Sequence, residues 1–218
     1  MCSGRTLIDS TICKPQVSHP QFVIFDFGGV LIDWDPRHLY RKLIDDEAAI
    51  EHFLSTICTR AWNERQDEGR PWSEAVAELV AQHPTQRALI EAYWHRWPEM
   101  IRSQIDETVL IADELRRRGV PLFGLTNWSA ETFPVARQRF DFVGWFEAIV
   151  VSGEEGVMKP DPEIFRRLLE RNGLRARDAL FVDDNLANVQ SAKRLGIEGH
   201  HFKTAQALRQ LLVEVGLL

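Results

Sequence analysis

The sequence is poor in cysteine and has no long hydrophobic run. Of its 218 residues only Cys2, Cys13 and Cys58 are cysteines. A widely spaced, odd set forms neither a metal pattern nor a disulfide framework, so we expect a reducing, cytoplasmic setting. No segment approaches the roughly 20 apolar residues that span a bilayer, and the first 20 residues show no signal-peptide pattern. We therefore expect no membrane partner.

The chain also lacks an excess of positive charge. Its formal net charge is −6, and acidic and basic residues are interspersed along it. Proteins that bind nucleic acids usually carry clustered Lys and Arg, so we expect no nucleic-acid partner. The length suits one large domain or a core with a smaller insert. A monomer and a small homo-oligomer are both compatible with this pattern.

Short apolar runs predict strands that are buried on both faces. The four clearest runs are Phe22–Phe27, Val120–Asn127, Glu147–Ser152 and Ala179–Asn185, and Gly199–Phe202 is a weaker fifth. Amphipathic helices are expected between and after them, at Thr108–Gly119, Asp161–Gly173, Leu186–Gly196 and Thr204–Gly216. Strands that alternate with helices predict an α/β fold with a parallel sheet and right-handed crossovers.

Residues 36–105 do not follow this alternation. Their pattern is helical, we find no convincing strand in it, and it holds four of the seven tryptophans: Trp62, Trp72, Trp94 and Trp97. A helical block inserted after the first strand predicts a cap over the carboxyl edge of the sheet. The expected division is a core of residues 21–35 and 106–218, a cap of residues 36–105, and a leader of residues 1–20 that is mobile or packed on the surface.

Polar residues lie at the ends of the four clearest predicted strands or in the loops that follow them. In an open α/β sheet, ligands bind outside these carboxyl ends. The residues in question are Asp26 with Gly28-Gly29, Thr126-Asn127, Lys159, and Asp183-Asp184. Taken singly, each has an ordinary explanation as a helix cap, a turn residue or a solvated lysine. Their presence at successive strand ends favours a shared site.

The residue types suit phosphate chemistry. A carboxylate such as Asp26 can attack phosphorus and form a covalent intermediate. Three carboxylates in one pocket repel one another unless a cation offsets them, and Mg²⁺ prefers such oxygen ligands. Asp26, Asp183 and Asp184 therefore predict a magnesium site. Thr126, Asn127 and Lys159 would hold the phosphoryl oxygens of a small phosphate ester and stabilise the transition state.

From Phe22 to its C-terminus the chain resembles the haloacid dehalogenase superfamily. The matching pieces are FDFGGVLID, LTN, the lysine-proline of GVMKPDP, and FVDDNLANVQSAKRLG. The resemblance implies a Rossmann-like core with an inserted helical cap. It also implies that Asp26 is the nucleophile, that Thr126 binds phosphate and that Lys159 pairs with both. Asp183, Asp184 and the backbone carbonyl of Gly28 would be magnesium ligands, with Gly28 and Gly29 beside the phosphate.

One position departs from the family pattern. Phosphatases of this superfamily usually carry a second aspartate, an acid and base, two residues after the nucleophile, where this chain has Gly28. In this the chain is similar to a bacterial subgroup that includes α-D-glucose-1-phosphate phosphatase. Proton transfer of this kind contributes roughly 10²–10⁴-fold in rate, so its loss favours leaving groups that need little protonation.

The sequence offers several other candidates for supplying the missing proton and for shaping the pocket. Candidate proton donors are Asp33, Asp35, Glu68 and Arg60, although each is as readily explained as structural or solvated. Trp34 and Trp128 lie beside the nucleophile and phosphate segments and are the aromatic candidates for the pocket wall.

The leading hypothesis is a magnesium-dependent phosphatase that acts on a small phosphorylated metabolite such as a sugar phosphate, through an aspartyl-phosphate. One alternative is a 2-haloacid dehalogenase with the same nucleophile, which Gly28 permits and the Asp183-Asp184 pair disfavours. The other is a module that holds phosphate on Asp26 without turnover.

Overall fold

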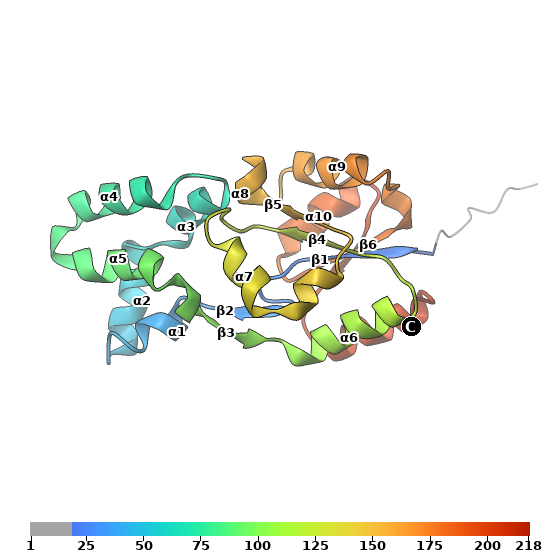
Figure 1. The fold of residues 1–218 in the computed structure, drawn as a ribbon, viewed down its shortest axis with the longest axis horizontal. Coiled ribbons are helices and arrows are strands. Elements are labelled where there is room, and N and C mark those ends of the chain that lie inside the picture. The colour runs from blue at the N-terminus through green and yellow to red at the C-terminus, as the bar shows by residue number, and fades with distance from the viewer. Residues whose placement is uncertain (1–18) are drawn as a thin grey trace, which may run out of the picture.

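The computed structural model describes residues 19–218, which form a sheet-containing core and a helical part beside it (Figure 1). The predicted leader at residues 1–20 lies outside this range except for His19 and Pro20, as do Cys2 and Cys13. No helix in the described range is long and apolar enough to cross a membrane.

The core is built on a five-stranded parallel sheet in the order β5-β4-β1-β6-β7. Its strands are β1 (Phe22–Phe25), β4 (Leu122–Thr126), β5 (Ala148–Val151), β6 (Ala179–Asp183) and β7 (Glu198–His201). All five predicted strands are therefore confirmed, the weaker fifth included. Because β4 and β6 flank β1 directly, the residues at the ends of these three strands must lie together.

Helices cover both faces of this sheet (Figure 1). Val23 and Phe25 of β1 face the layer that contains α6 and α11, whereas Phe22 and Ile24 face α9 and α10. This burial on both faces explains why the strand sequence is continuously apolar. The core helices are α6 (Asp106–Arg117), α7 (Phe133–Arg139), α8 (Ser152–Glu155), α9 (Pro162–Arg171), α10 (Leu186–Arg194) and α11 (Ala205–Glu214), with 3₁₀ turns η3 (Asp141–Trp145) and η4 (Ala176–Asp178).

The segment that follows β1 forms the helical part. Its helices are α1 (Arg37–Tyr40), α2 (Glu47–Thr56), α3 (Arg60–Asp67), α4 (Trp72–Gln82) and α5 (Arg87–His95), with 3₁₀ turns η1 (Pro84–Gln86) and η2 (Trp97–Met100). Aromatic rings fill its interior: Trp72 stacks on Tyr93 at 5.6 Å between centroids and meets Trp62 edge-on at 5.5 Å. These tryptophans therefore serve packing.

The prediction that residues 36–105 contain no strand is wrong at one place. Strand β3 (Ile101–Gln104) pairs antiparallel with β2 (Ile32–Trp34), and this small sheet joins the two parts of the molecule. Neither strand exceeds four residues, and a bulge interrupts their register between Asp33 and Trp34. Such short strands carry no readable alternation, so only their pairing defines them.

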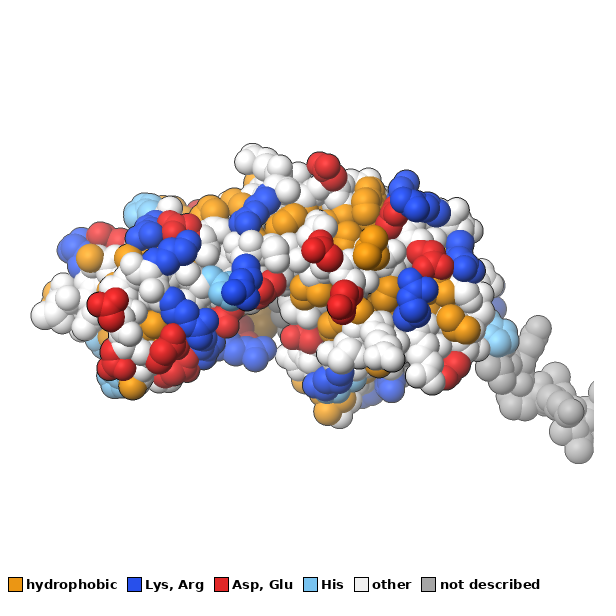
Figure 2. Space-filling model, turned by 90° about the horizontal axis from the view of Figure 1, so that it is seen from below, with side chains coloured by type: hydrophobic (Ala, Val, Ile, Leu, Met, Phe, Trp, Pro, Cys, Tyr) orange, Lys and Arg blue, Asp and Glu red, His pale blue; other side chains and the backbone are white. Residues whose placement is uncertain are grey.

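The surface agrees with the mixed charge pattern of the sequence. Figure 2 shows acidic and basic side chains interspersed on the face seen from below, without a large patch of either sign.

Candidate active site

The carboxyl ends of β1, β4 and β6 bring the predicted site residues together. Asp26 directly follows β1, Thr126 ends β4 and Asp183 ends β6. Hydrogen bonding between the strands continues through the site, since the backbone N–H of Asp26 donates to Val182 O at 2.9 Å. All three side chains are buried. The sheet thus fixes their positions before any side-chain contact is made.

Lys159 lies at the centre of this group. Its Nζ is 3.0 Å from Asp26 Oδ1 and 2.8 Å from Asp183 Oδ2, and it donates to Leu125 O at 2.7 Å. The side chain is fully buried. Burial alone would lower the pKa of Lys159, but Asp183 and Asp26 outweigh burial and raise it. Lys159 is therefore a fixed positive charge that touches the predicted nucleophile.

Asn127 holds the loop that carries Lys159. Its amide Nδ2 donates to Lys159 O at 2.8 Å, and its Oδ1 accepts from the backbone N–H of Lys159 at 2.8 Å. Asn127 also lines the cleft described below. The amide therefore positions the lysine, and the second N–H of its Nδ2 remains available to a ligand.

Asp183 is bound on both of its carboxylate oxygens. In addition to Lys159, Asn188 Nδ2 lies 3.1 Å from Oδ1 and 3.0 Å from Oδ2, and the backbone N–H of Asn185 donates to Oδ1 at 2.7 Å. The sequence reasoning missed Asn188. The sequence does contain a signal for Asn188, because a polar residue in the first turn of a helix that directly follows the acid pair lies close to those acids.

Asp184 differs from Asp183 in being exposed to the cleft. Its backbone oxygen is 2.9 Å from Nε2 of His201 in β7. Gly29 lies close to the carboxylate of Asp184, since a Cβ on Gly29 would be 2.5 Å from Asp184 Oδ2. Gly29 also has a φ of +71°, a conformation that glycine adopts without strain.

Carboxylate oxygens of Asp26, Asp183 and Asp184 all lie within 4.8 Å of one another. Burial, together with the neighbouring Asp183, raises the pKa of Asp26 to about 7 despite Lys159, and burial with Asp183 also raises that of Asp184. One ammonium does not balance three carboxylates. A cluster of carboxylates with surplus negative charge fits a hard divalent cation such as Mg²⁺.

Thr126 presents a buried hydroxyl with nothing bound to it. It is 1% exposed, and its Oγ1 has no hydrogen-bond partner within the described structure. Buried polar atoms are nearly always paired, so an unpaired one at the strand ends, next to the residues that line the cleft, marks a place for a ligand atom. A phosphoryl oxygen is an acceptor that would satisfy this hydroxyl.

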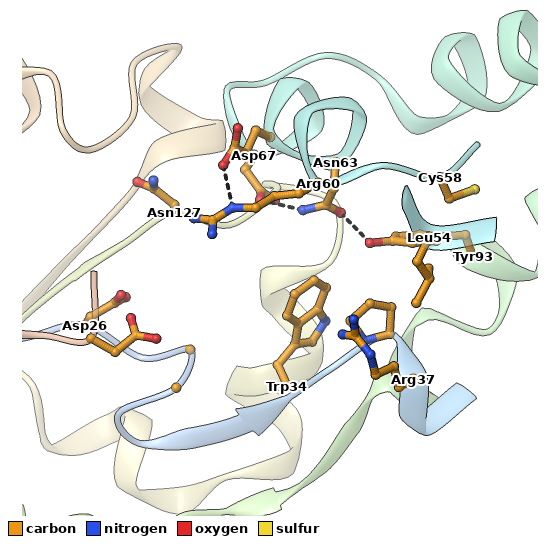
Figure 3. A pocket seen from close by; sticks show the side chains of 15 residues that line it. Asp26, Trp34, Arg37, Leu54, Cys58, Arg60, Asn63, Asp67, Tyr93 and Asn127 are labelled. Carbon is orange, nitrogen blue, oxygen red and sulfur yellow. Dashed lines mark hydrogen bonds and ion pairs between the residues drawn. The ribbon is translucent and has the colours of Figure 1, made fainter. Parts of the chain in front are cut away.

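These groups open into a cleft of ≈ 460 Å³ between the core and the helical part (Figure 3). The core contributes Asp26, Gly28, Gly29, Asn127 and Asp184. The other wall comes from β2, from helices α1, α2, α3 and α5 and from the residues beside them, and it is mixed in character. Its lining is Trp34, Pro36, Arg37, Leu54, Cys58, Arg60, Asn63, Glu64, Asp67 and Tyr93.

A hydrogen-bonded chain of two buried residues and the half-buried Asp67 lines the helical side. Tyr93 OH donates to Asn63 Oδ1 at 3.1 Å, and Asn63 Nδ2 donates to Asp67 Oδ2 at 2.7 Å (Figure 3). Burial raises the pKa of Asp67 to about 8, although the backbone N–H of Ser129 opposes this. Sequence reasoning considered the neighbouring Glu68 and missed Asp67, because α3 lacks a pattern that shows which acid faces the core.

Most of the other candidates from the sequence lie elsewhere. Asp33 pairs with His38 at 3.0 Å and Asp35 with Arg37 at 3.2 Å, and neither they nor Glu68 line the cleft. Trp128 does not line it either, because it is buried against Trp97 and Phe133. Arg60 and Trp34 do face the cleft.

Comparison with known proteins identifies the family. The family model of haloacid dehalogenase-like hydrolases matches residues 21–196. The chain belongs to this family. It is therefore a hydrolase, and the α/β architecture predicted from sequence is that of its structural relatives.

Two curated relatives and one solved structure show the range of this family. The chain is 28% identical to "Sesquiterpene phosphatase astK" of Aspergillus oryzae, over 87% of this chain and 95% of that protein. It is 38% identical to "Drimenol cyclase drtB" of Aspergillus calidoustus, over 87% of this chain but only 35% of that protein. The magnesium complex of the Bacteroides thetaiotaomicron family enzyme bt-2542 has a TM-score of 0.68 at 19% identity, covering 89% and 98% of the two chains.

Proposed function

We propose that this hydrolase is a magnesium-dependent phosphatase that cleaves a small phosphate monoester through a phosphorylated Asp26. The observation that carries the proposal is the contact between Lys159 and Asp26, made beside two further carboxylates and the unpaired hydroxyl of Thr126. An attacking carboxylate, a fixed cation and a vacant donor are the parts that phosphoryl transfer requires.

Each residue contributes to the transfer in its own way. Asp26 attacks phosphorus, the ester bond breaks, and water then releases phosphate from the aspartyl group. Lys159 orients the attacking carboxylate and offsets charge on the phosphoryl oxygens. Thr126 donates its hydroxyl to one of these oxygens, and the glycine loop at Gly28 and Gly29 lets the backbone approach another.

The magnesium ion would be held by Asp26, Asp184, the carbonyl of Gly28 and, directly or through its neighbours, Asp183. Because Asp183 is already saturated by Lys159 and Asn188, Asp184 offers the freer carboxylate. When bound, the ion offsets carboxylate repulsion and draws charge from the phosphoryl group.

Two classes of substrate fit the mixed wall of the cleft. Polar side chains such as Arg60 and Asn63 suit a sugar phosphate, as in the glucose-1-phosphate phosphatase subgroup that the opening motif resembles. Trp34, Leu54 and Tyr93 suit an apolar alcohol, as the name of the Aspergillus oryzae relative suggests. We favour a small phosphorylated metabolite and leave the choice between the two to experiment.

The test is phosphate release from a panel of sugar, terpenyl, aryl and alkyl phosphates, with Mg²⁺ and with EDTA, for wild type and Asp26→Asn. We expect metal-dependent turnover in wild type and a loss of at least about 10³-fold in the variant, because the nucleophile is removed. Equal rates with and without metal would contradict the proposal.

The same panel separates the alternatives. Chloride release from 2-chloropropionate without metal would establish a dehalogenase instead. A stable phospho-Asp26 that forms from acetyl phosphate and releases no phosphate would establish the module without turnover.

A further inference from the structure

Gly28 occupies the position at which related phosphatases carry the acid–base aspartate, so this protein has no side chain there. A Cβ on Gly28 would meet no atom within 4 Å, so no neighbour has moved in to replace it. The expelled oxygen of an ester nevertheless needs a proton unless it leaves as a stable anion. If the family's donor is absent, a donor must come from another wall of the cleft or the enzyme must be restricted to activated esters.

Two carboxyl groups of the helical side line the cleft, and they differ in their partners. Glu64 accepts a hydrogen bond from Nε of the Arg60 guanidinium at 2.8 Å. Asp67 takes part in no salt bridge among the described residues, and its partners are the neutral amide of Asn63 and the backbone N–H of Ser129. A buried carboxyl without a cationic partner favours its neutral form, which carries a proton.

Hydrogen bonds hold Asp67 in place. Asn63 Nδ2 donates to Asp67 Oδ2, Tyr93 OH donates to Asn63 Oδ1, and Ser152 Oγ donates to the backbone oxygen of Asp67. The residue therefore lies at the junction between the helical part and the start of α8, and it faces the cleft from the side opposite Asp26 (Figure 3). An ester whose phosphate reaches Asp26 extends its leaving group toward this wall.

We propose that Asp67 is the proton donor to the leaving group, in place of the aspartate that Gly28 lacks. The inference rests on the proposed phosphatase function. As Asp26 attacks phosphorus and the P–O ester bond breaks, the departing oxygen takes the proton of Asp67. In the second half, Asp67 carboxylate accepts a proton from the attacking water, the bond from phosphorus to Asp26 breaks, and inorganic phosphate leaves.

The charged and titratable neighbours set the conditions for this role. Glu64 and Arg60 on α3 act on Asp67 with opposite signs, and Tyr93 faces it from α5. Burial dominates and raises the pKa of Asp67 to about 8, so the group is protonated at neutral pH and still able to exchange its proton.

The experiment compares Asp67→Asn with wild type on phenyl phosphates whose phenols differ in acidity, and on alkyl phosphates. We expect the variant to keep its rate on 4-nitrophenyl phosphate and to lose about 10²- to 10⁴-fold on alkyl esters, with a steeper dependence on leaving-group acidity. Glu64→Gln, which changes the other carboxyl of the same wall, should leave that dependence as in wild type. Wild-type turnover of alkyl esters should fall as the pH rises through about 8.

Asparagine has the shape of the neutral acid, so the variant should fold, and a melting temperature at pH 6 near that of wild type verifies this. Equal losses on activated and alkyl esters would reduce Asp67 to a structural residue and overturn the proposal. The proposal would also be overturned if the wild-type enzyme cleaved aryl phosphates but no alkyl phosphate. Failure of wild type on every ester would instead contradict the phosphatase function itself.

Discussion

At the scale of single residues, the site depends on one buried ammonium between two buried carboxylates. Lys159 contacts Asp26 and Asp183, and the exposed Asp184 completes an acid group with surplus negative charge. Breaking such a buried pair costs about 3–5 kcal/mol because it leaves an uncompensated charge. The buried pair therefore stabilises the fold as well as arranging the nucleophile, and a variant of Lys159 should lose stability as well as activity.

The two loop glycines provide a matched pair of substitutions. Gly29→Ala should cost about 1–2 kcal/mol for a side chain at positive φ, and its Cβ would also push Asp184 away from a contact of 2.5 Å. Gly28→Ala enters open space. We expect Gly29→Ala to weaken Mg²⁺ activation strongly and Gly28→Ala to fold normally, as measured by turnover against Mg²⁺ concentration and by melting temperature. Equal Mg²⁺ dependence in the two variants would be evidence against the predicted role of Asp184.

At the scale of elements, the loop between α3 and α4 joins the helical part to the core. Ser152 of α8 bonds to the backbone of Asp67, Trp72 Nε1 donates to Ser129 Oγ at 3.0 Å, and Trp72 N donates to Glu131 at 2.9 Å. A Cβ on Gly69 would lie 3.2 Å from the backbone oxygen of Gly153. These contacts are polar and close, so the α3–α4 junction is held against the loop that follows β4 and against α8.

The buried acid in this junction predicts a pH-dependent stability. Folding raises the pKa of Asp67 from its ordinary 3.8 to about 8, so the folded state retains a proton that the unfolded chain loses in between. Wild type should therefore lose stability as the pH rises from about 4 to about 8, since the folded state binds more protons there. The asparagine side chain of Asp67→Asn cannot ionise, so the variant should not show this fall in stability with pH.

Chemical unfolding at pH 5 and pH 8 measures the difference. The variant should gain stability relative to wild type at the higher pH, and Glu64→Gln should show no such gain. A variant that parallels wild type at both pH values would mean that the Asp67 carboxyl is already ionised in the folded protein.

At the scale of the whole molecule, the cleft is shared between two parts that meet through β2, β3 and the α3–α4 loop. A ligand that binds in the cleft of the folded protein should stabilise it, by about 2.7 kcal/mol at a concentration of one hundred times its Kd. Orthophosphate with Mg²⁺ is the simplest such ligand.

Thr126→Val tests whether phosphate binds where we place it. The substitution removes a buried hydroxyl that has no partner in the structure, so the free protein should be as stable as wild type or slightly more stable. The rise in melting temperature on adding Mg²⁺ and orthophosphate should shrink. If the variant were stabilised as much as wild type, phosphate would not contact Thr126 Oγ1.

The sequence by itself determined the sheet and the acids at its edge. Apolar runs ending in Asp26, Thr126 and Asp183 were readable because strand burial and strand ends leave a local signature, and parallel topology then forces these ends together. The same local patterns explain why four helices of the core, α6, α9, α10 and α11, were predicted within a few residues of their bounds, whereas no bounds were predicted for the short helices α7 and α8.

Only the tertiary structure decided what faces the cleft from the other side. Asp67 and Tyr93 are distant in sequence from the residues that they approach, and α3 carries no pattern that separates Asp67 from Glu68. The pairing of β2 with β3 was hidden for a related reason, since each strand is stable only against its partner. Local sequence encodes what a segment can form, whereas contacts between distant segments depend on how the complete chain packs.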